Sequence, residues 1–138
     1  MTEFVNPVVS ADGEGRTAMA FGTHVVRICG EETGGALGVI EATLPPGAGP
    51  PMHVHAREDE LFRVLSGRFG FWCAQSYVEL EAGGLVALPR GVPHRFRNVG
   101  DREGTIMAIV TPGGFERFFL DIEAKSPAGP AEIGEIAA

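Results

Sequence analysis

Hydrophobic residues fall into short runs along this chain, and glycine, proline, asparagine or aspartate interrupts them at intervals of about ten residues. The runs are rich in Val, Ile, Leu and Phe, which favour half-buried strands. We expect eight strands, at residues 24–29, 37–44, 61–65, 68–73, 77–80, 85–88, 94–98 and 105–111. Many short strands without helices between them are typical of a β-sandwich or barrel. The pattern therefore predicts an all-β fold.

One short helix is expected after the last strand. Four apolar residues recur there with the spacing of a single helix face: Phe115, Phe118, Phe119 and Ile122. We expect this helix to pack outside the barrel or at its mouth. The 138 residues are the length of one domain, divided into an N-terminal arm (1–20), a barrel (21–112), the helix (113–125) and a tail (126–138).

Turn chemistry predicts how two neighbouring strands are joined. Ser66 and Gly67 separate the runs 61–65 and 68–73. Glycine readily adopts the positive φ that tight turns require, so this junction predicts a β-hairpin.

The acidic balance of the chain excludes two classes of partner. Eleven basic and eighteen acidic residues give a formal charge of −7. Such a charge repels nucleic acid and anionic lipid, and no apolar stretch is long enough for a membrane helix. The first residues lack the pattern of a signal peptide, so we expect a cytoplasmic protein.

The two cysteines do not indicate a zinc or disulfide site. Cys29 and Cys73 lie within apolar runs and form no Cys-x-x-Cys pair. Buried thiols that act as small hydrophobic residues are the simplest interpretation.

Three of the four histidines, with one glutamate, form a candidate metal site. Alternate side chains of an extended strand share one face, so His53 and His55 can point into a barrel together. Glu60 lies five residues after His55, where the next strand begins, and His94 begins another strand far along the chain. Imidazole and carboxylate ligands suit iron, manganese, nickel, cobalt, copper or zinc.

Two segments around these residues resemble the two sequence motifs of the cupin superfamily. The first motif reads GAGPPMHVHAREDELFRVLSG from Gly47 to Gly67, and the second reads GGLVALPRGVPHRFRN from Gly83 to Asn98. Every motif position is present, and fifteen residues separate the motifs, as in small single-domain cupins.

The resemblance implies a double-stranded β-helix, the jelly-roll barrel of cupins. It also implies that one divalent metal ion per chain binds His53, His55, Glu60 and His94. Cupins commonly form homodimers through their outer sheets, often with an exchanged N-terminal strand, so we expect a homodimer in which the arm 1–20 takes that part.

Other residues near the site have more ordinary interpretations. Phe62 shares a strand face with Glu60, and Phe96 shares one with His94, so both are candidates for the wall of a substrate pocket. His24 is interpreted as a surface or core residue, although it could look into the cavity. Phe71 and Trp72 face opposite ways, and the sequence leaves open which faces inward.

The function follows from the open positions that three imidazoles and one carboxylate leave on a metal ion. The two motif segments and the phenylalanine-rich end of the chain are similar to small cupins related to quercetin dioxygenase. This similarity implies a metal-dependent dioxygenase that acts on a small aromatic or enolic molecule, with Glu60 as ligand and base. A non-catalytic or sensory ligand-binding module and a metal-dependent isomerase or lyase remain alternatives.

Overall fold

A computed structural model describes residues 3–119 and 121 of the chain. Nine strands and one short 3₁₀ helix occur in that part: β1 (Arg16–Met19), β2 (Thr23–Ile28), η1 (Gly30–Thr33), β3 (Gly38–Leu44), β4 (Asp59–Ser66), β5 (Arg68–Cys73), β6 (Ser76–Glu81), β7 (Leu85–Leu88), β8 (His94–Asn98) and β9 (Gly104–Thr111). No helix within the described residues is both long and apolar enough to cross a bilayer.

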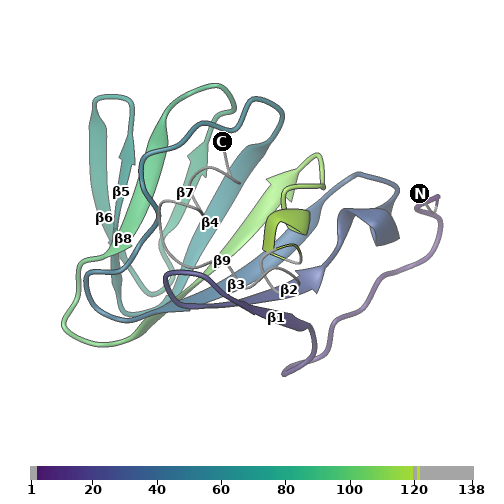
Figure 1. Ribbon diagram of the computed structural model, residues 1–138, viewed down its shortest axis with the longest axis horizontal. Helices are drawn as coiled ribbons and strands as arrows, with labels where there is room; N and C mark the ends of the chain where they lie inside the picture. Colours follow the sequence, from purple (N-terminus) through teal and green to yellow (C-terminus); the bar gives the residue numbers. More distant parts are fainter. Residues whose placement is uncertain (1–2, 120, 122–138) are drawn as a thin grey trace.

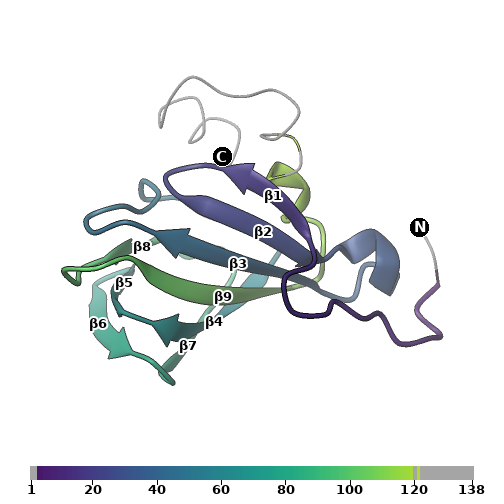
Figure 2. The ribbon, with the colours of Figure 1, turned by 90° about the horizontal axis from the view of Figure 1, so that it is seen from below.

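The strands form two antiparallel sheets that face each other. The larger sheet has the order β1-β2-β3-β9-β4-β7, and the smaller has the order β6-β5-β8. Figure 1 shows the two sheets spreading apart from a common edge, and Figure 2 shows the same layers from below. This arrangement is the predicted jelly roll.

The core lies between the sheets because buried residues alternate along the strands. Every second residue of β3 is buried from Gly38 to Leu44, and β9 repeats the pattern from Gly104 to Val110. Phe62 of β4 extends this buried layer, and Phe69 and Phe71 of β5 meet it from the smaller sheet. The sequence left open which of Phe71 and Trp72 faces inward. Phe71 does, and Trp72 lies outside beneath the Arg95 guanidinium.

All eight predicted strands are confirmed, with bounds that differ by at most two residues at either end. The structure adds β1, which pairs with β2 of the same chain and lies at the end of the predicted arm. Cys29 and Cys73 are free thiols, as expected, but both are half-buried rather than buried.

The predicted hairpin at Ser66 and Gly67 is wrong, although the tight turn is real. Gly67 has the positive φ of 82° that the turn requires. However, β4 pairs with β7 and β9, whereas β5 pairs with β6 and β8. The chain therefore crosses from one sheet to the other at this glycine, so that both strands turn their apolar faces to the shared core.

The chain after β9 folds back over one end of the barrel. Residues 117–119 and 121 are helical, in agreement with the predicted short helix, while residues 120, 122–125 and the predicted tail 126–138 lie outside the described part. The buried Glu116 carboxylate accepts hydrogen bonds from the backbone N–H groups of Gly30 (3.1 Å) and Gly114 (2.9 Å). These bonds anchor the segment, and Phe118 and Phe119 pack against Val26 and Ile40.

Asn98 ties the loop between β8 and β9 to the end of β3. Its amide nitrogen donates to the carbonyl oxygens of Leu44 (2.9 Å) and Arg102 (2.8 Å), and its amide oxygen accepts from Gly100 N–H (2.9 Å). The side chain is fully buried. Asn98 is therefore a structural residue that stabilises a turn.

We predict that Asn98→Ala lowers the free energy of unfolding by about 1–3 kcal/mol or more, because it leaves buried peptide groups without partners. Chemical denaturation of the two proteins measures the change. The exposed Asn6 provides the matched control, since Asn6→Ala should change stability by less than about 0.5 kcal/mol. Equal stability of Asn98→Ala and the wild type would contradict the assignment.

Candidate metal centre

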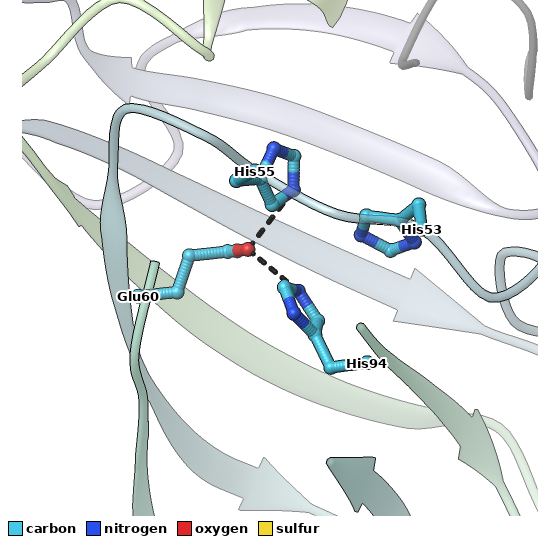
Figure 3. A group of neighbouring side chains, drawn as sticks. All are labelled: His53, His55, Glu60 and His94. Carbon is cyan, nitrogen blue, oxygen red and sulfur yellow. Dashed lines mark hydrogen bonds and ion pairs between the residues drawn. The ribbon is translucent and has the colours of Figure 1, made fainter. Parts of the chain in front are cut away.

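The four predicted ligands come from three parts of the chain and meet inside the barrel. His53 and His55 lie between β3 and β4, Glu60 is the second residue of β4, and His94 is the first residue of β8. One nitrogen or oxygen atom from each side chain lies within 4.8 Å of those of the others. Figure 3 shows the three imidazoles around the Glu60 carboxylate.

Backbone hydrogen bonds fix the His-x-His segment, although it forms no longer strand. His53 and His94 pair as a single antiparallel bridge, with N–H to O distances of 3.0 and 2.9 Å. The carbonyl oxygen of His55 accepts a hydrogen bond from Gly91 N–H at 2.8 Å. Segments of both motifs thus hold each other in place, and the positions of their side chains are fixed as a result.

The Glu60 carboxylate is the centre of the cluster. Its Oε1 atom lies 3.0 Å from Nε2 of His55 and 3.0 Å from Nε2 of His94. The His94 contact has the geometry of a hydrogen bond, whereas the angles of the His55 contact fall outside that geometry. Since Glu60, His55 and His94 are all buried, these contacts are shielded from water.

A second set of groups orients the imidazoles from behind. Nδ1 of His53 lies 2.8 Å from the carbonyl oxygen of Pro51, and Nδ1 of His94 lies 3.1 Å from that of Val92. Nδ1 of His55 lies 3.3 Å from the Glu58 carboxylate. In a neutral imidazole, an acceptor at Nδ1 favours the proton there and leaves the lone pair of Nε2 for a metal ion. The donor set therefore fits a divalent metal ion held by three Nε2 atoms and one carboxylate oxygen.

The charges of the cluster residues also favour a cation. Burial raises the pKa of Glu60, but contacts with His55 and His94 outweigh burial and lower it to about 2. Burial lowers the pKa of His53 to about 4. Burial also lowers the pKa of His94, but the hydrogen bond to Glu60 and its negative charge raise the net value above 6.5. At neutral pH the site thus offers an ionised carboxylate and a neutral His53.

A cavity of about 580 Å³, counting the part open to solvent, adjoins the cluster. His53 and Glu60 contribute to its wall, together with both predicted pocket residues, Phe62 and Phe96. Ala42 and Ala108 lie on the central strands, where their small side chains leave the space free. The cavity is therefore polar at the cluster and apolar over most of the rest.

Several lining residues were not predicted as pocket residues. Phe21, Phe115, Phe118 and Phe119 complete the aromatic wall, and the Phe115 ring lies 4.1 Å from that of His55. The helical spacing of the last three gave the only signal, and it placed them outside the barrel or at its mouth. Of the two positions expected for His24, the surface is wrong and the core is confirmed, and the residue also lines the cavity.

Comparison with known proteins agrees with this architecture. The sequence matches the family model of the cupin domain over residues 40–110, just over half of the 138 residues. It is 26% identical to quercetin 2,3-dioxygenase of Bacillus subtilis over 114 residues, which are 82% of this chain and 34% of that protein. It is 28% identical to polyketide synthase CurC of Streptomyces cyaneus over 96 residues, which are 70% of this chain and 61% of that protein. The chain thus spans less than two thirds of either relative.

Solved structures share the fold at low sequence identity. KdgF from Halomonas sp. superposes with a TM-score of 0.71 at 15% identity, covering 81% of this chain and 99% of that one. A predicted oxalate decarboxylase from Thermotoga maritima gives a TM-score of 0.69 at 19% identity, covering 76% and 99%. At such identities the likeness shows a common fold.

We predict that loading the protein with Zn²⁺ in mildly acidic buffer releases protons from His94. The raised pKa favours the protonated imidazole, and metal binding requires the neutral form. Affinity for the ion should therefore fall as pH falls through the pKa of His94. Calorimetry in buffers of different ionisation enthalpy measures the protons released.

Glu60→Gln is the control for this measurement. Without the carboxylate, only the hydrogen bond to the Val92 carbonyl still opposes burial, so the pKa of His94 should fall and fewer protons should be released per ion bound. The same release from both proteins would show that Glu60 does not set the protonation of His94.

Proposed function

The chain belongs to the cupin family, and from this premise we propose that it is a metal-dependent dioxygenase acting on a small aromatic or enolic molecule. The observation that carries the proposal is the position of the four-residue cluster at the wall of a cavity lined by phenylalanine rings. The similarity to quercetin 2,3-dioxygenase over 82% of this chain supports an oxygen-dependent reaction.

We assign the metal to His53, His55, Glu60 and His94, with one divalent ion per chain. Iron, manganese, nickel, cobalt, copper and zinc all suit these ligands. Four ligands leave one or two positions of a five- or six-coordinate ion for substrate. When bound, such an ion supplies a Lewis acid for a substrate oxygen and, if redox-active, a route for electrons to O₂.

The protein residues position the substrate and take its proton. Glu60 is ionised at neutral pH and lines the cavity. We assign it as the base that accepts the proton of a substrate enol or phenol hydroxyl. The rings of Phe62 and Phe96, whose centroids lie 5.1 Å apart, orient a planar substrate and keep water from the reacting atoms.

Oxygen uptake by metal-loaded protein tests this function. We expect about one iron, manganese, nickel, cobalt or copper ion per chain by elemental analysis, and oxygen consumption with one or more of a panel of flavonols, catechols and cyclic enolones. His53→Ala, His55→Ala and His94→Ala should each lose most of the metal and the uptake while remaining folded. His24→Asn changes the fourth histidine and should keep the metal.

Each outcome selects among the functions of this site. Bound metal with turnover but no oxygen uptake would favour an isomerase or lyase. A co-purifying organic ligand without turnover would favour a binding or sensory module. Unchanged metal content in all three alanine variants would overturn the site assignment itself.

We also propose that two chains associate through the outer face of the larger sheet. An apolar row crosses four of its strands there, because the register aligns Ala87, Leu61, Ile109 and Val39. Leu61 is exposed, and so are the arm residues Phe4, Val5 and Val9. A second copy of the chain would cover these side chains and remove their apolar surface from water.

We predict that Leu61→Glu converts a dimer into single chains of 14.6 kDa, because it places a charge in the buried apolar row. Gel filtration with light scattering measures the mass. Tyr77→Glu, on the outer face of the smaller sheet, should leave the dimer intact. A wild-type mass equal to that of one chain would rule out the association.

A further inference from the structure

His24 occupies the cavity wall at a distance from the metal cluster. It lies on the inner face of β2 and is buried, with 1% of its surface exposed. Its ring stacks on Phe119, with centroids 4.4 Å apart, and meets the edge of Phe21 at 4.8 Å. The imidazole thus forms part of the same aromatic wall that surrounds the cavity.

Both ring nitrogens of His24 lack a hydrogen-bond partner among the described residues. The backbone of Gly22 is near enough to favour the protonated ring, yet it makes no hydrogen bond of acceptable geometry. A buried polar group without a partner is unfavourable and calls for an explanation. The three cluster histidines differ, since each has an acceptor beside its Nδ1 atom.

The imidazole of His24 is a neutral donor and acceptor. Burial lowers its pKa to about 4, so the ring is uncharged at neutral pH. One nitrogen then carries a proton and the other a lone pair. A hydroxyl group, which both donates and accepts, is the complement of such a ring, whereas an ionised group would be costly among phenylalanine side chains.

His24 and the cluster lie at opposite sides of the cavity floor. Strands β3 and β9 separate β2 from β4 in the larger sheet, so His24 and Glu60 lie three strand spacings, ~14 Å, apart across the sheet. The register places His24 level with Val64, so Glu60 also lies four residues, roughly 13 Å, further along the strands. Ala42 and Ala108 occupy the strands between them. Both polar ends line the same cavity, whose wall between them is apolar.

We propose that His24 is a specificity-determining residue that hydrogen-bonds a hydroxyl group at the end of the substrate farthest from the metal. The substrate class is then a planar enolic or phenolic ring with chelating oxygens at one end and a neutral hydroxyl at the other. The inference rests on the proposed function for the chelating end, and His24 extends it by selecting the far end.

A pair of metal-chelating probes tests this role without turnover. Kojic acid is a hydroxypyranone with a hydroxymethyl group opposite its chelating oxygens, and allomaltol carries a methyl group in that place. With Zn²⁺-loaded protein, calorimetry should show that kojic acid binds about tenfold more tightly than allomaltol. In His24→Leu the two affinities should become equal within about twofold, mainly because kojic acid binds less tightly.

Two further variants separate hydrogen bonding from packing. His24→Asn keeps a donor and an acceptor and should retain part of the preference for kojic acid. It also tests the role of His24 if His24→Leu does not fold. Phe118→Leu changes an apolar lining residue and should alter both affinities by the same factor. His24→Leu should also melt no lower than the wild type in the absence of a probe, because the imidazole nitrogens have no partner to lose.

The outcomes distinguish this inference from the proposed function. Binding of both pyranones without discrimination by the wild type, or a preference that survives in His24→Leu, overturns the role of His24 alone. Failure of both pyranones to bind the Zn²⁺-loaded protein overturns the open coordination position, and the inference falls with it.

Discussion

The structure depends on how a charged carboxylate is kept inside an apolar barrel. Glu60 points to the same interior as Phe62 and Phe96, where an unpaired charge would be very costly. Two imidazoles at 3.0 Å make the position tolerable. Because Glu60 and His94 belong to different sheets, this pairing can form only when the sheets close on each other. Closure of the barrel and assembly of the site are the same event.

Short loops determine how the imidazoles are presented. The carbonyl oxygens that orient His53 and His94 each belong to the residue two positions earlier in the chain. Prolines lie in both loops, and they restrict the backbone that carries these carbonyls. The orientation of the ligands is therefore a local property of the two motif segments. The barrel supplies only their distance from each other.

Sequence reasoning succeeded where the signal was local and failed where partners came from afar. Alternating burial located the eight strands, and motif spacing located the residues of the cluster. Strand β1 was not predicted because its buried face consists of Ala18, which carries little hydrophobic signal. The hairpin at Gly67 was wrong because a turn does not specify which strands pair. The place of His24 in the cavity depends on Phe21 and Phe119, whose proximity no spacing rule predicts.

The two alanines of the cavity floor determine the size of the cavity, whereas other residues supply its polar groups. Ala42 and Ala108 lie on β3 and β9, outside the segments that carry the cluster residues, and their small side chains leave room in the cavity. A longer side chain at either position would shorten the chamber from below and leave every polar group in place. The size of the molecule that the cavity accepts can thus change independently of the residues in the cluster. A lineage of such proteins can diversify in what it accepts, one methylene at a time, around an unchanging centre.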